Sequence, residues 1–501
     1  MKHKTLGQVF TPNWIVDEIL DSIGFKNENT ITKKIIDPAC GDGAFLKNIV
    51  KRIIAFCLLK NCSSEKIKKC LEGHVYGIEL DEIEYLNCIN NLNNLVKYEL
   101  GETLHVNWKI FNSNTLIKYK EFLGFFDLVV GNPPYIRIHN LDKETRRLLK
   151  EEFIFSEGTI DIYISFFEIG FKLLNKKGQL GYITPNSYLH NSSYIRFRKY
   201  LKQHKAVKSI ADFKANKIFK GFSTYTAITI INFHEKKDFF NYKELDDGKI
   251  KEINKIKYDE TNHINWSFSN KKNMAFLKKL YSNTNKKVTD FFNVQYGFAT
   301  LRDNIFVNDI EQEKENLALF NKHWIEKDLL YKIVKGSTYK GDMSDYTFII
   351  FPYKKEHNRF VRVPENELKK SYPETYKYLL KHKEELEKRN MDKGSLWYEF
   401  GRSQGIQTIH EKKIVISTLI KDKINYYKVD DKTFVYSGVF ITKKISEANW
   451  KMIEGILDSN DFFKYVWITG KDFSGGYKSL TSKQIKNFPT KELNHQQSIF
   501  C

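Results

Sequence analysis

Residues 127–135 read DLVVGNPPY, an apolar run that ends in a glycine, an asparagine, two prolines and a tyrosine. The apolar run predicts a buried β-strand, and ligands of open α/β sheets bind at the carboxyl ends of such strands. The two prolines fix the backbone and remove two donors, which leaves rigid carbonyl groups at that end. The Asn132 amide oxygen and the Pro133 carbonyl can then accept from one NH2 group, while Tyr135 offers a flat face for a planar base or amide. The same residues could instead form an ordinary turn.

A glycine-rich turn lies upstream, where residues 37–46 read DPACGDGAFL between an expected strand and an expected helix. Gly41 and Gly43 permit a tight turn and let a ligand approach the backbone closely. A dinucleotide-binding fingerprint would place Gly or Ala three residues after the second glycine, where this chain has Leu46. A smaller cofactor that contains a nucleoside therefore fits better than NAD.

An acidic residue ends the next expected strand, in residues 77–81, GIELD. In a nucleotide-binding βαβ unit a carboxylate at this place accepts hydrogen bonds from both ribose hydroxyls, and Glu79 is the candidate here. The alternative interpretation is that Glu79 is an ordinary surface carboxylate at the end of a strand.

The pattern around these segments predicts an α/β domain. Residues 33–233 alternate short apolar runs with amphipathic stretches such as 44–59 and 162–174, whose apolar residues recur three and four positions apart. Such alternation is typical of a mostly parallel sheet with helices on both faces. The expected strands are 34–36, 75–78, 126–130, 178–183 and 227–233.

The pattern changes in the second half of the chain. From about residue 236 to 287 it dissolves into Lys, Asp and Asn, apart from a short helical patch at 274–280. Beyond it, scattered β-like runs and one charged helical stretch predict an α+β domain. The runs are 348–351, 413–419 and 434–441, and the helical stretch is 373–389. We therefore expect a first domain at 1–245, a connecting segment at 246–287 and a second domain at 288–501.

The composition of the chain bears on its partners. Its 501 residues include 81 Lys and Arg against 61 Asp and Glu, a formal charge of +20. Such a positive charge favours binding to a polyanion, with nucleic acid the commonest candidate. An AT-rich genome, which favours Lys codons, would give the same excess of basic residues. Nine Lys or Arg lie within residues 196–220, either as a grip on phosphates or as a solvated face.

Cysteine content and hydropathy bear on the environment of the protein. Six cysteines are too few for a disulfide scaffold, and the spacing of Cys57, Cys62, Cys70 and Cys88 matches no usual zinc pattern, so we expect free thiols and no metal. The longest apolar run, 53–59, is far too short to span a membrane, and the first ten residues lack the apolar region of a signal peptide. These features predict a soluble, cytoplasmic protein.

Together, the segments resemble the γ class of amino-group DNA methyltransferases, the TaqI and Eco57I type. Residues 7–12, GQVFTP, resemble the motif of that class that binds the cofactor's carboxylate, and 161–168, DIYISFFE, and 181–187, GYITPNS, resemble its next two motifs. The match is continuous over about residues 7–233. The resemblance implies a class I methyltransferase fold, S-adenosylmethionine as the cofactor, and N6 of an adenine in duplex DNA as the substrate.

The resemblance also assigns roles to residues. Catalysis is implied for Asn132, Pro133, Pro134, Tyr135 and Phe219. Cofactor binding is implied for Thr11, Pro12, Asp37, Ala39, Gly41, Gly43, Glu79, Leu80, Asn114 and Asn132. Two positions depart from the family pattern. Asn114 stands where the family usually has an Asp that binds the cofactor's adenine, and the aromatic residue that stacks on the target base could be Phe219 or Phe222.

The second domain resembles the target-recognition domain of that class through residues 296–300, YGFAT, and 397–402, WYEFGR. Length and layout most resemble the BsuBI and PstI modification enzymes, which would imply the site CTGCAG. We therefore expect the modification half of a restriction-modification system, with double-stranded DNA and a separately encoded restriction endonuclease as partners. Whether the protein is a monomer or a dimer stays open. The motif at Gly7 leaves no room for a nuclease before it, but a nuclease within 288–501 is not excluded.

Three other functions compete with this hypothesis. A protein-glutamine methyltransferase of the release-factor type uses the same Asn-Pro-Pro-Tyr site, and so could an RNA methyltransferase. Neither accounts as well for the N-terminal motif together with a large basic second half. A DNA-binding module without catalysis is the third alternative, but the Asn-Pro-Pro-Tyr segment and the glycine turn argue against it.

Overall fold

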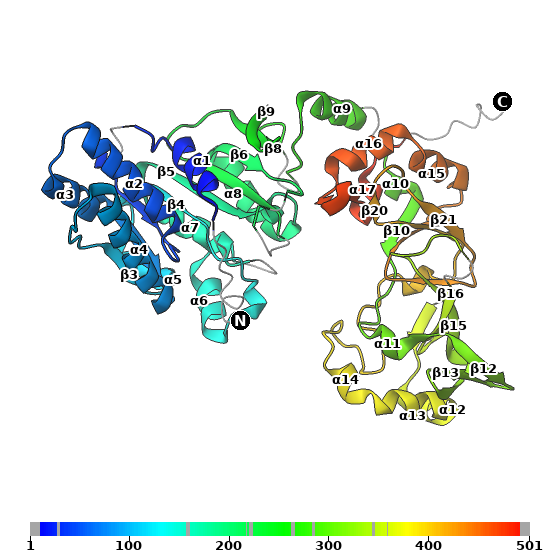
Figure 1. Cartoon of the computed structure of the whole chain (residues 1–501). Helices are drawn as coiled ribbons and strands as arrows, with labels where there is room; N and C mark the ends of the chain where they lie inside the picture. Colours follow the sequence, from blue (N-terminus) through cyan, green and yellow to red (C-terminus); the bar gives the residue numbers. More distant parts are fainter. Residues whose placement is uncertain are drawn as a thin grey trace. The chain divides into compact units, whose positions relative to one another are not determined.

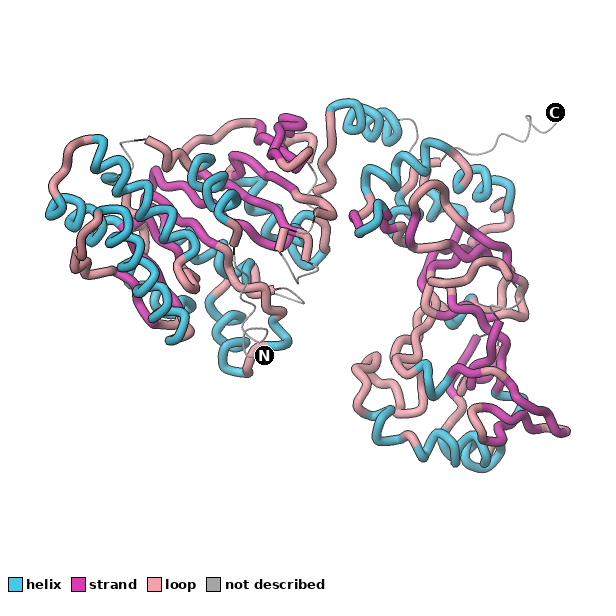
Figure 2. Tube along the Cα trace, in the orientation of Figure 1, coloured by secondary structure: helices cyan, strands magenta, loops and turns pink. Residues whose placement is uncertain are grey.

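The structure is a computed structural model that describes residues 11–490 except 28–30, 157–160, 217, 220–223, 262–265, 283–285, 343–345 and 358. The chain forms two compact units, Met1–Met274 and Ala275–Cys501. Figure 1 labels many of the helices and strands of both units, and Figure 2 colours the chain by secondary structure. No described helix is long and apolar enough to cross a membrane.

The first unit is built on one large sheet. Its described strands have the order β3-β2-β1-β4-β5-β7-β6-β8-β9, and neighbours are parallel except at β7 and between β8 and β9. The strands are β1 Ile35–Asp37, β2 Val75–Glu79, β3 Lys109–Asn112, β4 Phe126–Gly131, β5 Leu174–Pro185, β6 Val207–Asp212, β7 Thr226–Asn232, β8 Phe239–Asp246 and β9 Lys249–Lys257. The first seven have the strand order of a class I methyltransferase, with β7 antiparallel. The predicted fold class is therefore confirmed.

Helices and two hydrophobic clusters cover both faces of this sheet (Figure 1). In β4, Leu128 and Val130 belong to one cluster and Val129 to the other, because successive side chains point to opposite faces. This burial on both faces is why the strand is a continuous apolar run in the sequence. The helices of the first unit are α1 Asn13–Ser22, α2 Ala44–Leu59, α3 Ser64–His74, α4 Glu82–Leu100, α5 Thr115–Lys118, α6 Lys143–Glu152, α7 Tyr163–Leu173 and α8 Ile195–His204. Helix α9, Lys271–Ser282, contains the boundary between the two units.

Strands β8 and β9 extend the sheet beyond the seven strands of that order. Residues 249–257, which the sequence analysis assigned to a connecting segment, form β9, and the first unit continues to Met274. The expected end of the first domain at residue 245 therefore needs correction. Lysines alternate with isoleucines in β9 at the edge of the sheet, and charged edge strands of this kind resist pairing with another chain.

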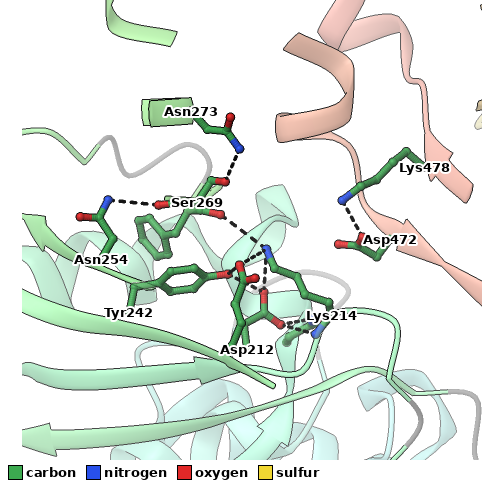
Figure 3. A network of polar contacts seen from close by, with 11 residues as sticks. Asp212, Lys214, Tyr242, Asn254, Ser269, Asn273, Asp472 and Lys478 are labelled. Atoms are coloured by element: carbon green, nitrogen blue, oxygen red, sulfur yellow. Dashed lines mark hydrogen bonds and ion pairs between the residues drawn. The ribbon is translucent and has the colours of Figure 1, made fainter. Parts of the chain in front are cut away.

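A buried polar network fastens β8 to the end of β6 (Figure 3). Asp212, which is 1% exposed, accepts hydrogen bonds from the Asn186 amide at 2.9 Å and from the Lys214 backbone N–H at 3.0 Å. The Lys214 ammonium lies 3.5 Å from Asp212 and 3.4 Å from Glu244, and the Tyr242 hydroxyl donates to Glu244 at 2.8 Å. Burial raises the pKa of Asp212, but Lys214 and the Asn186 hydrogen bond outweigh it and lower that pKa overall. The ionised Asp212 carboxylate thus links the end of β6 to β8 and to Asn186, which directly follows β5.

The second unit consists of several small sheets and short helices, which agrees with the predicted α+β class (Figure 2). Its two four-stranded sheets have the orders β10-β23-β19-β21 and β11-β16-β15-β22. Their strands are β10 Phe292–Tyr296, β11 Val307–Asn308, β15 Leu330–Lys335, β16 Tyr346–Ile350, β19 Lys413–Ile416, β21 Tyr426–Val429, β22 Phe434–Tyr436 and β23 Val439–Lys443. The expected run 434–441 is two strands, because Ser437 has a positive φ of 49° that interrupts it.

Smaller elements complete the second unit. Its other strands are β12 Ile310–Lys314, β13 Leu317–Phe320, β14 His323–Glu326, β17 Tyr353–Glu356, β18 Arg359–Arg362, β20 Leu419–Ile420, β24 Asp472–Phe473 and β25 Tyr477–Ser479. Its helices are α10 Val288–Phe291, α11 Asp303–Phe306, α12 Glu365–Ser371, α13 Pro373–Lys381, α14 Lys383–Glu387, α15 Trp450–Leu457, α16 Asn460–Thr469 and α17 Ser482–Asn487. The charged stretch 373–389 thus contains α13 and α14.

We predict that Arg198→Ala destabilises the first unit. The Arg198 guanidinium is fully buried and donates to the backbone carbonyls of Tyr188 and Asn191. Its removal leaves buried acceptors unsatisfied and opens a cavity, so the free energy of unfolding should fall by about 3 kcal/mol. Urea denaturation measures this difference. Lys199→Ala, at an exposed position of the same helix, is the control and should change it by less than about 0.5 kcal/mol. Equal effects of the two changes would contradict the structural role of Arg198.

Candidate active site

A cavity of about 350 Å³ lies where the carboxyl ends of β1, β2 and β4 meet. Nine of the residues that the sequence analysis singled out line it, although they come from five separate parts of the chain. They are Thr11, Asp37, Ala39, Gly41, Glu79, Leu80, Asn114, Asn132 and Pro134. The other predicted residues, Pro12, Gly43, Pro133, Tyr135 and Phe219, are not among the residues of the cavity wall.

The glycine turn after β1 has a backbone path that other residues would strain. Gly43 has a φ of 89°, and a Cβ atom added to it would lie 2.9 Å from the Cys88 sulfur. Gly43 therefore allows the turn to pack closely against Cys88. The Cys40 N–H donates to the Ile78 carbonyl at 3.1 Å, which fixes the turn against β2.

The Glu79 carboxylate connects this turn to the end of β2. One of its oxygens accepts from the Gly41 N–H and the other from the Asp81 N–H, both at 2.8 Å. Burial raises the pKa of Glu79, and these backbone hydrogen bonds oppose that shift only in part. A carboxylate has about four acceptor positions, so each oxygen keeps capacity for one more donor. Glu79 is thus both a structural link and a candidate acceptor for ligand hydroxyls.

Asp37 lies at the end of β1 and is the most deeply buried acid of the cavity, at 1% exposed. One of its oxygens accepts from the Ala39 N–H at 3.0 Å. The same oxygen lies so close to Gly131 that a Cβ atom there would approach it to 2.6 Å. Burial raises the pKa of Asp37 to about 8, and the nearby Glu79 charge adds to the shift.

The asparagine of the Asn-Pro-Pro-Tyr segment contacts the N-terminal part of the chain. The Asn132 amide donates to the Thr11 hydroxyl at 3.1 Å, although 121 residues separate the two. Pro134 lines the cavity, and Pro133 is buried behind it. The end of β4 therefore meets the Thr-Pro segment, as expected if both serve one ligand.

Tyr135 and Phe219, which are both candidates for stacking on the target base, contact each other. The rings of Tyr135 and Phe219 meet edge to face, with centroids 6.4 Å apart and planes inclined by 70°. Phe219 is buried, and the Tyr135 hydroxyl points toward the Ile183 carbonyl at 3.5 Å. Phe222 lies outside the described residues. The choice between Phe219 and Phe222 therefore stays a prediction.

Asn114 has a local structural role in addition to its place in the cavity wall. Its amide oxygen accepts from the Leu116 N–H at 3.0 Å and caps α5. The oxygen has a second acceptor position, which a ligand amino group could use.

The sequence analysis missed one wall of the cavity. The stretch after β4, including the start of α6, supplies Asn140, Leu141, Asp142 and Thr145. A capping pattern was the available signal, since Asp142 accepts from the Thr145 N–H three residues later, but such a pattern marks a helix start and not a site.

The charge of the cavity is opposite to that of the chain. Six acids line it and, among its described lining residues, there is no Lys, Arg or His. The acids are Asp37, Asp42, Glu79, Asp81, Glu84 and Asp142. A wall of one sign concentrates ligands of the other sign, so this cavity favours a cation and disfavours phosphate groups. Among the described residues, no group of three or more His, Cys, Asp and Glu side chains is arranged to hold a metal ion.

Most of the described basic residues in 196–220 have partners within the protein. Arg198 and Lys202 donate to backbone carbonyls, and Lys208 donates to the Ser22 carbonyl and the Gln179 side chain. Lys205 pairs with Asp238, and Lys214 with Asp212 and Glu244. Arg196 and Lys199 are exposed on α8, whereas Lys217 and Lys220 lie outside the described residues. The run thus stabilises the fold, and only a part of it can grip phosphates.

The two segments that resemble a target-recognition domain pack together in the second unit. Ala299 and Arg402 exchange backbone hydrogen bonds of 3.0 and 2.9 Å, and the Phe298 and Phe400 rings stack with centroids 4.4 Å apart. The buried Arg389 guanidinium donates to three carbonyls of these segments. The segments therefore form part of the core of the second unit.

Comparisons with known proteins show that the first unit is similar to a family of methylases. The family model for the Eco57I restriction-modification methylase matches residues 51–219. The type II restriction enzyme and methyltransferase RM.Eco57I of Escherichia coli is 25% identical over 96% of this chain and 56% of its own length. The type II methyltransferase M.BstVI of Geobacillus stearothermophilus is 28% identical over 45% of this chain and 42% of its own length. The chain thus spans about half the length of these curated relatives.

A solved structure is similar over nearly the whole chain. The type IIL restriction-modification enzyme MmeI, in complex with DNA, matches 94% of this chain and 65% of its own chain, with a TM-score of 0.62 and 14% identity. DrdV, also solved with DNA, matches 87% of this chain and 49% of its own, with a TM-score of 0.53 and 13% identity. At this identity the two structures support the fold alone. The family model and RM.Eco57I show that the chain contains a segment similar to an Eco57I restriction-modification methylase.

Proposed function

We propose that the chain is a sequence-specific DNA methyltransferase, which transfers a methyl group from S-adenosylmethionine to N6 of a flipped-out adenine. The observation that carries the proposal is an Asn-Pro-Pro-Tyr segment at the end of β4, beside a cavity lined only by acids among its charged described residues. The proposal includes a role as the modification half of a restriction-modification system, with a separate endonuclease that cleaves the unmodified site.

The cavity fits the cofactor by its charge and by its hydrogen-bond acceptors. S-adenosylmethionine contains a nucleoside, a sulfonium, an ammonium and one carboxylate but no phosphate, and its net positive charge suits a cavity with six acids and no described basic residue. Glu79 would accept from the ribose hydroxyls, Asn114 from the adenine amino group, and the acids near Asp37 would face the positive end. When bound, this cofactor supplies an electrophilic methyl group on a sulfonium.

The residues at the end of β4 would hold the amine that attacks this methyl group. The Asn132 amide oxygen and the Pro133 carbonyl accept from an exocyclic NH2, and these bonds draw the nitrogen lone pair out of conjugation with the ring. The Thr11 hydroxyl, which accepts from the Asn132 amide NH2, orients the amide for this task. Tyr135 and a phenylalanine, Phe219 or Phe222, would stack on a base that has left the duplex.

DNA is the proposed substrate because of the relatives and the net charge. RM.Eco57I is a restriction enzyme and methyltransferase, and the MmeI structure contains DNA. The formal charge of +20 fits a polyanion outside the acidic cavity. We assign catalysis to the first unit, Met1–Met274, and reading of the DNA sequence to the second, Ala275–Cys501.

The proposed function predicts N6-methyladenine in one sequence context. DNA from a methylation-free host that expresses the chain should carry this base at a single recognition site, as read by sequencing that distinguishes modified bases. The Asn132→Ala protein is the control and should leave DNA unmodified. Methylated cytosine in place of adenine would contradict the proposed base, and unmodified DNA from the wild-type protein would contradict the proposed function.

Glu79→Gln should weaken binding of S-adenosylmethionine. Loss of the charged acceptor removes hydrogen bonds worth about 1.5–3 kcal/mol each, so the dissociation constant should rise by at least about tenfold. Fluorescence or calorimetric titration of the cofactor measures it. Glu82→Gln removes an exposed carboxylate three residues away that does not line the cavity, and it should bind like the wild type. Equal affinity of both variants would show that Glu79 is not the ribose ligand.

Asn132→Ala should slow methyl transfer with little effect on cofactor affinity. Loss of one acceptor that acts on the reacting amine lowers turnover by about 10²–10³. Thr11→Val removes the hydroxyl that orients Asn132 but keeps the Asn132 amide. The rate of methyl transfer should therefore fall less in this variant than in Asn132→Ala. Single-turnover rates with saturating cofactor compare the two. A wild-type rate for Asn132→Ala would exclude the proposed role of this amide.

A further inference from the structure

The acids of the cavity differ in how their charge is balanced. Asp42 lies 3.3 Å from the Lys47 ammonium, and Glu79 accepts two backbone N–H groups. Asp142 accepts from both the backbone N–H and the hydroxyl of Thr145 at the start of α6. Asp37 accepts only the Ala39 N–H among the interactions of the described residues, and no basic side chain pairs with it there.

Within the described part of the chain, the groups around Asp37 offer no positive charge. Glu79 from β2 is an acid, Cys40 from the glycine turn is a buried thiol, and Tyr182 from β5 is a buried phenol. On the β4 side, Asp37 meets the backbone of Gly131. A buried carboxylate without a cation loses its hydration and gains nothing in return, so the neutral form is favoured. The raised pKa of Asp37, about 8, has the same cause.

We propose that Asp37 is uncharged in the ligand-free cavity and ionises when the positive end of S-adenosylmethionine enters. The carboxyl O–H bond breaks and the proton passes to the buffer, so cofactor binding releases a proton. This inference rests on the proposed function, because it requires that the cavity binds this cofactor.

The consequence is selection between the cofactor and its product. Methyl transfer turns the sulfonium into a neutral thioether, so S-adenosylhomocysteine carries one positive charge fewer. With the product, less charge is present to keep Asp37 ionised, and the carboxyl takes up a proton again. Asp37 is therefore a specificity-determining residue, which raises the affinity for S-adenosylmethionine relative to the affinity for S-adenosylhomocysteine.

Isothermal titration calorimetry of the full chain at pH 7, in buffers of different ionisation enthalpy, measures the released proton. Because the pKa of Asp37 is raised above this pH, the wild type should release a proton on binding S-adenosylmethionine. S-adenosylhomocysteine has the same amino and carboxyl groups and should release clearly less. Sinefungin has an amine in place of the methyl sulfonium and, as a cation, should release as much as the cofactor.

Two variants assign the proton. Asp37→Asn keeps the acceptor for the Ala39 N–H, and it should abolish the release and narrow the preference for cofactor over product by about tenfold. Asp42→Asn is the matched control, because the Asp42 carboxylate already has a cation beside it, and the release should persist. Thermal melting of each variant verifies that it is folded.

The wild-type titrations alone can overturn the inference. Cofactor binding with heats that do not depend on the buffer, or equal proton release with S-adenosylhomocysteine, would contradict it. Release that persists in Asp37→Asn and disappears in Glu79→Gln would assign the proton to Glu79 and also overturn it. A wild-type chain that binds no S-adenosylmethionine would instead contradict the proposed function itself.

Discussion

The contact between the Glu79 carboxylate and two backbone N–H groups is the constraint on which the site depends. Gly41 and Asp81 both donate to this carboxylate at 2.8 Å, so the turn after β1 and the turn after β2 hold one position relative to each other. Residues of both turns line the cavity, so the contact that holds the turns together also holds two parts of the cavity wall together. The neighbouring contact of Asp37 with Gly131 brings the end of β4 to the same place, since a side chain at residue 131 would collide with Asp37.

The separation of charge within the chain is the second organising feature. The whole chain has a formal charge of +20, yet the described charged residues that line the cavity are all acids. A basic chain with an acidic cavity suits a protein that meets a polyanion outside and a cation inside. Asp37 and Glu79 are buried with no basic partner among the residues that the structure describes, and burial destabilises their ionised forms, which is the expected cost of a cavity for a positive ligand.

The sequence predicted those parts of the site that follow from local chemistry. The helix expected at 44–59 is α2, Ala44–Leu59, because a turn that needs glycines precedes an amphipathic run. The Asn-Pro-Pro-Tyr segment could be placed at the end of β4 from the sequence. A strand buried on both faces is a continuous apolar run, and the run ends where this segment begins. These signals are contained within about ten residues each.

The parts that the sequence did not reveal depend on distant contacts. Strand β9 is an exception, because it pairs with β8 in a local hairpin across residues 247–248, but its four Lys, one Glu and one Asn made the segment look like a polar connection. The sequence left open whether the basic run grips phosphates or is a solvated face, because its partners, such as Asp238 and Glu244, lie tens of residues away. The wall from α6 was missed for the same reason, since Asp142 lies near the glycine turn only in the folded chain.

The most direct test of the account is a crystal structure of the full chain with S-adenosylmethionine. We expect the nucleoside in the cavity at the ends of β1, β2 and β4, both ribose hydroxyls on the Glu79 carboxylate, and the positive end beside Asp37 with no Lys, Arg or His in contact. A cofactor bound elsewhere, or a basic side chain that moves in beside it, would contradict the claim that a wall of carboxylates selects a cationic cofactor.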